Sequence, residues 1–259
     1  SGCLWADGVR DLAGAEEAML ALTCARAGIE DGMAILDLGC GWGSLSLWLA
    51  EQYPNATILG VSNSNGQREW IEAEAQRRGF DNLEIRTQDV NDFDADRRFD
   101  RVVSIEMFEH MRNWAELLRR IATWLEPDGR VFVHVFSQRR LPYLFQGTWA
   151  AERFFTAGLM PSHDLMSFFQ RDLVLEQRWV VPGTHYARTL QAWLRNLDAN
   201  RDEALRVLGR REPPSVARRR LATWRLFLLS TDEIWKWRGG DEWLVSHYLL
   251  APRASAAAG

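Results

Sequence analysis

Short apolar runs and segments of helical periodicity alternate along the first half of the chain. Apolar residues recur at helical spacing in four segments, at 14–28, 44–51, 67–78 and 115–125. Short runs of mainly apolar residues predict five strands, at 34–38, 57–61, 83–87, 101–105 and 130–136. Strands that alternate with helices usually pair in parallel, so the pattern predicts an α/β fold with an open, mostly parallel sheet.

The regular alternation of predicted strands and helices ends after Phe136. Residues 137–170 carry aromatic residues, prolines and glycines without a clear period, and we expect an insertion over the carboxyl edge of the sheet. The later segments predict a strand at 173–181, helices at 188–208 and 215–237, and a last strand at 243–250. Other signals predict a turn at Pro127-Asp128-Gly129 and a frayed tail at 254–259.

Composition and charge limit the classes of protein to which the chain can belong. With 259 residues, 47% of them hydrophobic, it can bury one substantial core, and we expect a single domain over 1–259. The net charge of -4 gives no general attraction for nucleic acid or anionic lipid. No apolar run reaches 18 residues, and the three cysteines form no disulfide or metal pattern. These features predict a cytoplasmic protein without stable membrane insertion, nucleic acid partner or metal, and they leave a homodimer open.

A glycine-rich loop joins the first predicted strand to the helix after it. It reads Ile35-Leu36-Asp37-Leu38-Gly39-Cys40-Gly41-Trp42-Gly43. Glycines let a backbone approach a ligand closely, and the start of a helix offers free N–H groups. A dinucleotide site would prefer an acidic residue at the end of the second strand, where this chain has Ser62-Asn63. The loop therefore favours another ligand, and a tight turn without a ligand is the alternative.

The loop from Asp37 to Gly43 resembles motif I of class I S-adenosylmethionine-dependent methyltransferases. Its Trp42 resembles a narrower set, formed by cyclopropane fatty acid synthases, mycolic acid synthases and coclaurine N-methyltransferases. The resemblance covers nearly the whole chain, with further motifs at 61–64 with Gln67, 88–90, 105–110, 132–134, 185–189 and 242–243. It implies a Rossmann-like sheet of seven strands with the last one antiparallel, helices on both faces and an acceptor-side insertion. It also implies substrate-side cap elements at 137–170 and 185–240.

The same resemblance implies the cofactor, S-adenosylmethionine, which leaves as S-adenosylhomocysteine. It assigns the cofactor contacts by position: Asp37 in the loop, Gly39 and Gly41 at the amino acid part, Ser62, Asn63 and Gln67 near the ribose, and Asp89, Val90 and Ile105 around adenine. Taken alone, Asp89 is equally well explained as the cap of a strand end.

Two carboxylates and an imidazole follow the fourth predicted strand, at Glu106, Glu109 and His110. The carboxyl ends of parallel strands form the ligand crevice of such sheets. An alkyl amine has a pKa of about 10.4, so presenting it as a free amine at pH 7 costs roughly 4.6 kcal/mol. A base that accepts this proton is therefore useful, and we predict that Glu109 and His110 take or position it while Glu106 holds the ammonium. The alternative is a helix start whose acidic residues complement its dipole.

The family that the chain resembles contains two chemistries. Glu106 and the segments 154–158 and 160–162 resemble the branch that methylates the nitrogen of a small, alkaloid-like secondary or tertiary amine. The alternative is cyclopropane-fatty-acyl-phospholipid synthase-type methylene transfer to an unsaturated lipid, with bound bicarbonate as the base. We predict a small-molecule amine substrate and retain the lipid as the alternative.

Four residues hold bicarbonate in the lipid branch: a Cys, a Glu, a His and a Tyr. The last three match Glu109, His134 and Tyr186 of this chain. The Cys position falls on Gly2, or on Cys3 if the pairing slips by one residue. We therefore expect His134 and Tyr186 to line the substrate pocket, and a buried core pair is the alternative.

Overall fold

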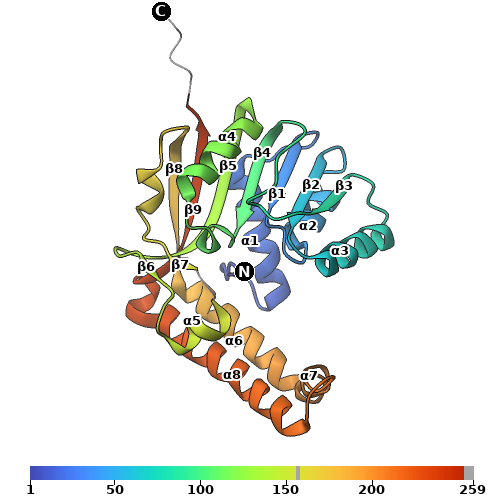
Figure 1. Ribbon diagram of the computed structural model, residues 1–259, viewed down its shortest axis with the longest axis vertical. Helices are drawn as coiled ribbons and strands as arrows, with labels where there is room; N and C mark the ends of the chain where they lie inside the picture. Colours follow the sequence, from blue (N-terminus) through green and yellow to red (C-terminus); the bar gives the residue numbers. More distant parts are fainter. Residues whose placement is uncertain (156–157, 254–259) are drawn as a thin grey trace, which may run out of the picture.

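The computed structural model describes residues 1–155 and 158–253, and a seven-stranded sheet forms its centre (Figure 1). The strand order is β3-β2-β1-β4-β5-β9-β8, and β9 runs antiparallel to both of its neighbours. The strands are β1 (Ala34–Leu38), β2 (Thr57–Ser62), β3 (Leu83–Thr87), β4 (Phe99–Ile105), β5 (Leu125–Gln138), β8 (Leu173–Pro182) and β9 (Trp243–Pro252). The predicted sheet is confirmed, including its antiparallel last strand, whereas the predicted frayed tail lies outside the described residues.

Helices cover both faces of the sheet. Successive strand residues point to opposite faces, so a strand that is covered on both sides is apolar throughout. In β1, Ile35 belongs to one core cluster, whereas Leu36 and Leu38 belong to the other. The cluster of Ile35 takes its helical residues from α1 (Leu12–Ala27) and α2 (Ser44–Gln52), and that of Leu36 from α4 (Trp114–Trp124). The helix α3 (Asn65–Arg78) packs into a further cluster with Leu47 of α2.

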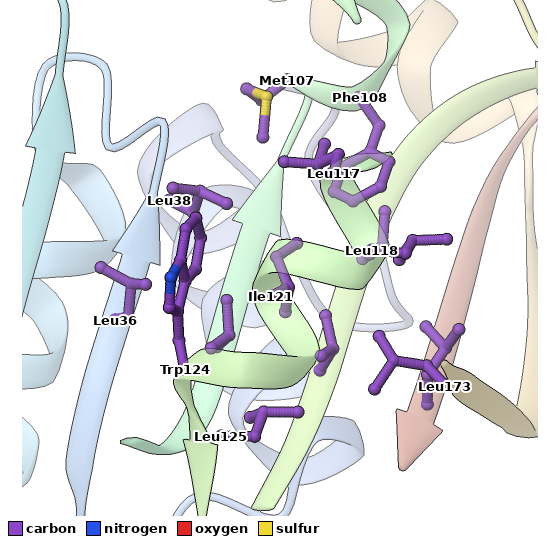
Figure 2. Close-up of a cluster of buried hydrophobic side chains, with 14 of the residues drawn as sticks. Leu36, Leu38, Met107, Phe108, Leu117, Leu118, Ile121, Trp124, Leu125 and Leu173 are labelled. Carbon is purple, nitrogen blue, oxygen red and sulfur yellow. The ribbon is translucent and has the colours of Figure 1, made fainter. Parts of the chain in front are cut away.

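The cluster under α4 anchors the segment that carries the acidic residues. Figure 2 shows Ile121 and Trp124 on the side of α4 that faces the strands, with Leu36 of β1 close to Trp124. Met107 and Phe108, which stand between the two predicted catalytic carboxylates, belong to the same buried cluster. Burying an apolar side chain of this size stabilises the fold by about 1.5–3 kcal/mol. The backbone around Glu106 and Glu109 is thus held by the core.

The remaining elements gather beyond the carboxyl ends of the parallel strands (Figure 1). Two long helices lie side by side and extend away from the sheet as an arm, with a short helix at its tip. Within the described ranges, no helix is both long enough and apolar enough to cross a bilayer. These elements are β6 (Tyr143–Leu144), α5 (Trp149–Phe154), β7 (Leu159–Met160), α6 (Gly183–Ala199), α7 (Arg201–Leu208) and α8 (Pro214–Lys236).

The predicted turn at Pro127-Asp128-Gly129 is wrong, because β5 begins at Leu125 and continues through these residues. Leu125 pairs with Phe99 and Arg130 with Arg101, so β5 bulges there against β4. A Cβ on Gly129 would lie 2.9 Å from the Phe99 carbonyl oxygen. Glycine therefore allows a close approach of two strands rather than a reversal of the chain.

The predicted helix at 188–208 is wrong in its start and in its continuity. It begins at Gly183, directly after Pro182, and is divided at Asn200 into α6 and α7. The Asn200 side-chain amide donates to the Asn196 carbonyl at 2.9 Å. Such a local bond competes with the backbone bonds of a continuing helix. The earlier start places the motif at 185–189 on the first turns of α6, at the edge where the strands end.

Candidate active site

The glycine loop bends between β1 and α2 and borders a cavity. Gly39, Gly41 and Gly43 all have positive φ, at 88°, 55° and 82°. A Cβ on Gly39 would lie 2.8 Å from Met107 Cγ, and one on Gly43 would lie 2.7 Å from Ile71 Cγ1, so close packing requires both glycines. The glycine-loop cavity has a volume of about 320 Å³, and its lining includes Asp37, Gly39, Gly41, Trp42, Ile105 and Glu106.

Asp37 ties the loop to the helix that follows. It is buried, and its carboxyl accepts a hydrogen bond of 2.6 Å from the Ser46 hydroxyl. Burial raises the pKa of Asp37 to about 6, against the opposing effect of the Ser46 hydrogen bonds. Asp37 thus has a structural partner of its own, although it also borders the glycine-loop cavity.

Ile105, predicted beside adenine, ends β4 and lines the glycine-loop cavity, whereas the other residues predicted at the ribose and adenine lie at the carboxyl ends of β2 and β3. The Ser62 hydroxyl donates to the side chain of Gln67, which fixes the start of α3 against β2. Asp89 is exposed and accepts hydrogen bonds of 2.8 Å from the backbone and the side chain of Asn91. Asn63 is also exposed. The structure brings the residues at the ends of β2 and β3 beside the glycine loop, but none of these described residues lines its cavity.

Glu106 is the first residue after β4, and its backbone is held in the left-handed region with φ of 49°. Its N–H donates to the His134 carbonyl at 2.8 Å. Its carboxylate accepts from the Gly2 N–H and the Tyr186 hydroxyl, each at 3.1 Å. His134 Nε2 lies 3.6 Å from Glu106 Oε1. Donors from distant parts of the chain therefore converge on one carboxylate.

These donors keep Glu106 ionised. Burial alone would raise the pKa of its carboxyl, whereas His134 and the Gly2 N–H act against burial and lower that pKa. Burial, followed by the charges of Glu106 and Glu109, raises the pKa of Tyr186 well above its usual value. The Tyr186 hydroxyl therefore keeps its proton and remains a donor.

The pKa of Glu109 is shifted in the opposite direction. This residue belongs to a single 3-10 turn, η1 (Phe108–His110), and is buried, with no hydrogen-bond partner for Oε2 among the described residues. Burial and the charge of Glu106 raise the pKa of Glu109 well above its usual value. Two carboxylates whose pKa values are driven apart are a common sign of acid–base chemistry. An orphaned buried oxygen also marks a place for a ligand group.

A second cavity, of about 510 Å³, lies over these residues. Glu106, Glu109 and His110 line one side of it, and partial burial lowers the pKa of His110. We call it the aromatic cavity, because its other walls include Phe145, Trp149, Tyr186, Trp193, Trp235 and Trp243. The ring of Tyr186 stacks on Trp235, with centroids 4.3 Å apart and planes 8° from parallel. Glu106 borders both cavities, which therefore meet at its side chain.

Two residues next to this site, Arg26 and His247, are not predicted from the sequence. His247 of β9 stands in register with His134 of β5, and their rings are joined by a contact of 3.0 Å. Arg26, near the end of α1, contacts the other ring nitrogen of His247, Nδ1. A histidine in the mainly apolar run at 243–250 is the one signal that the sequence offers.

The strand order, the glycine loop after β1 and a cavity over the carboxyl ends of the strands define a class I S-adenosylmethionine-dependent methyltransferase. Residues 1–235 match the sequence profile of the family described as mycolic acid cyclopropane synthetase. The chain belongs to this family.

Similar proteins in this family include N-methyltransferases and lipid-modifying enzymes. The (S)-coclaurine N-methyltransferase of Thalictrum flavum subsp. glaucum is 36% identical over 258 residues, which cover 96% of this chain and 72% of that protein. The crystal structure of coclaurine N-methyltransferase bound to N-methylheliamine and SAH has a TM-score of 0.92 at 36% identity, covering 96% of this chain and 76% of that one. The cyclopropane-fatty-acyl-phospholipid synthase of Escherichia coli (strain K12) is 29% identical over 191 residues, 73% of this chain and 48% of that protein.

Proposed function

We propose that this enzyme transfers the methyl group of S-adenosylmethionine to the nitrogen of a small secondary or tertiary amine of alkaloid type. One observation carries the proposal: Glu106 borders both the glycine-loop cavity and the aromatic cavity. A carboxylate at this junction attracts a cationic amine, and aromatic walls add a cation–π attraction of about 0.5–2 kcal/mol. The relatives described as coclaurine N-methyltransferases support the same chemistry.

The glycine-loop cavity has the features that a cofactor site needs. Apart from the two residues next to it in the sequence, no described residue has an atom within 4 Å of the place where a Cβ on Gly41 would stand, so a ligand can approach this backbone closely. When bound, S-adenosylmethionine supplies an electrophilic methyl group on its sulfonium. We infer that the loop holds the amino acid part of the cofactor through Asp37, Gly39 and Gly41. We infer that the ribose lies near Ser62, Asn63 and Gln67. The adenine would then contact Asp89, Val90 and Ile105.

The amine must lose its proton before it can attack, and two neighbouring groups can accept that proton. His110 lines the aromatic cavity, and its lowered pKa leaves the imidazole neutral at pH 7. Glu109 has a raised pKa, so its carboxylate is a stronger base than an ordinary glutamate. We infer that these two groups take or position the proton, while the ionised Glu106 holds and orients the substrate nitrogen.

Of the two donors of the alternative, bicarbonate-dependent branch, Tyr186 is already engaged, whereas His134 Nε2 has no hydrogen-bond partner among the described residues. The Tyr186 hydroxyl bonds to Glu106, and His134 Nε2 faces the same carboxylate, which takes the place expected for an anion. A side chain at Gly2 would bring its Cβ to 2.7 Å from the Tyr186 ring, so the cysteine of that branch does not fit there. Both observations favour an amine over a lipid as the acceptor.

The proposal is tested with methyl-labelled S-adenosylmethionine and two acceptor pools. One holds small secondary and tertiary amines, including tetrahydroisoquinolines, and the other holds unsaturated phospholipid vesicles with and without bicarbonate. We expect label in the amine pool alone. Label that appears only in lipid and depends on bicarbonate would overturn the proposal.

Variants of the two proton acceptors test their roles. We expect Glu109→Gln and His110→Ala to lower turnover of the amine by about 10²- to 10⁴-fold, because each removes a proton acceptor. Calorimetric titration with S-adenosylhomocysteine should give unchanged affinity. The matched control is Glu116→Gln, on the exposed face of α4 beside Arg119, which should leave turnover unchanged. An equal loss of cofactor affinity in both active-site variants would show that their role is misassigned.

A further inference from the structure

A chain of polar contacts runs from the end of α1 through two strands to Glu106. Arg26 Nη1 lies 2.7 Å from His247 Nδ1, and His247 Nε2 lies 3.0 Å from His134 Nδ1. The far nitrogen of His134, Nε2, lies 3.6 Å from Glu106 Oε1. Both histidine rings are fully buried, with exposed fractions of 0%. The four residues come from α1, β9, β5 and the segment after β4.

The chemistry of arginine determines which atom donates and which accepts in each of these contacts. A guanidinium has only donors, so the Nδ1 atom of His247 must accept. A neutral imidazole carries one N–H, and that of His247 is therefore on Nε2 and donates to His134 Nδ1. His134 is left with its own N–H on Nε2, which faces Glu106.

The surroundings of His247 keep it in this state. Burial, followed by His134 and Arg26, lowers the pKa of His247 well below its usual value, so the ring stays neutral. The Arg26 guanidinium lies over the ring of Trp179, 4.9 Å from its centroid, and Phe132 packs edge-on against His247. The contact with Trp179 thus helps to hold the Arg26 guanidinium beside His247.

The same arrangement excludes His134 as a base. Nε2 of His134 already carries a proton. Protonation of Nδ1 would force His247 to move its proton from Nε2 to its own Nδ1, where it would meet an N–H of Arg26. Hydrogen bonds of an active site are often long without substrate and shorten when it binds, which suits the 3.6 Å contact to Glu106.

We propose that Arg26 and His247 are positioning residues that fix His134 as a hydrogen-bond donor to Glu106. This rests on the proposed function, because it gives His134 a place in that reaction. The donor keeps the Glu106 carboxylate charged and oriented toward the amine, which leaves Glu109 and His110 as the proton acceptors.

Two pairs of variants separate this role from simple packing. His247→Phe fills the space of the ring but removes both polar atoms, whereas His247→Gln keeps an acceptor for Arg26 and a donor for His134. Arg26→Met removes the hydrogen-bond donor to His247, and Arg26→Lys keeps a donor at this position. The polar variants therefore serve as matched controls for the apolar ones.

The direct readout is the tautomer of His134, measured by ¹⁵N NMR of the imidazole nitrogens in the full chain. We expect the Nε2–H tautomer in the wild type, in His247→Gln and in Arg26→Lys, and a mixture of tautomers in His247→Phe and Arg26→Met. In the last two variants kcat for the amine should fall roughly 10- to 100-fold, the range of losses seen when the supporting partner of a histidine is removed. The KM for S-adenosylmethionine should not change.

Two results would overturn the proposal: an Nδ1–H tautomer of His134 in the wild type, or apolar variants that keep both the tautomer and kcat. Thermal unfolding shows whether His247→Phe folds, and Arg26→Met supplies the same test if it does not. The expected tautomers without turnover of any amine would overturn the proposed function but would support the assignment of His134 as a donor.

Discussion

Glu106 and Glu109 are the same amino acid three positions apart, yet the fold shifts the pKa values of their carboxyl groups in opposite directions. Glu106 accepts from Gly2 and Tyr186, whereas Oε2 of Glu109 is buried without a described partner. The motif predicts that both residues lie at the reaction site. It does not predict the opposite shifts of their pKa values, because the donors to Glu106 come from residues about 80 and 100 positions away.

The raised pKa of Glu109 makes stability depend on pH. The folded state binds this proton more tightly than the unfolded chain, so the stabilisation is complete below the unfolded pKa of about 4.3. It declines as pH rises toward the folded pKa, by about 1.4 kcal/mol per pH unit. Glu109→Gln, a neutral isostere, removes this decline. We expect it to match the wild type near pH 4 and to exceed it at pH 7 in urea unfolding.

The exposed Glu116→Gln is the control for this comparison and should give no gain at pH 7. Other groups also titrate between pH 4 and 7, but they contribute equally to the wild type and to Glu109→Gln. The difference between these two proteins therefore isolates Glu109. Curves that stay parallel over the whole range would show that Glu109 is ionised in the folded protein.

At the scale of elements, α6 shows how a helix start depends on its neighbours. Gly183 lies so close to two other elements that a Cβ would stand 2.1 Å from the Trp243 carbonyl oxygen and 2.7 Å from that of Trp235. Both contacts are with backbone, which cannot rotate away. Gly183→Ala should therefore lower the free energy of unfolding by about 1–3 kcal/mol, the usual cost of overpacking, as measured by urea unfolding.

Gly66→Ala, in the first turn of α3, is the matched control. The nearest atom to a Cβ there is Ser64 Oγ at 4.0 Å. Alanine loses less backbone entropy than glycine when a helix forms, so this variant should be unchanged or more stable by about 0.5–1 kcal/mol. If both variants lose stability equally, close packing at Gly183 is not the cause.

The same contrast explains how far the elements can be predicted. The strands of the sheet are visible in the sequence, because burial on both faces favours runs of mainly apolar residues such as 34–38. The starts of α6 and β5 are not, because they depend on tertiary contacts at Gly183 and Gly129. Arg26 and His247 are 221 positions apart, and no local pattern joins them.

At the scale of the whole molecule, two cavities meet at one side chain, but different elements build them. The glycine-loop cavity lies between β1, α1 and α2, whereas the aromatic cavity lies under β6, α5, α6 and α8. Cofactor binding and amine binding should therefore be separable by mutation.

S-adenosylhomocysteine should stabilise the folded protein without any amine. At 100 times its dissociation constant a ligand adds about 2.7 kcal/mol, which corresponds to a rise in Tm of roughly 5–10 °C for a chain of this size. We expect Trp193→Ala, in the aromatic cavity, to keep this rise and to lose amine turnover. Asp89→Ala should reduce the rise at equal ligand concentration. A Trp193→Ala protein without the rise would contradict the separation.

The left-handed backbone of Glu106, with φ of 49°, has a consequence for how this protein can change. A side chain in that conformation costs about 1–2 kcal/mol relative to glycine, and asparagine tolerates it better than glutamate. A library selected only for heat resistance would therefore enrich glycine or asparagine at this position and discard the carboxylate. Activity and thermostability are in conflict at this one position, and engineering for robustness must hold it constant.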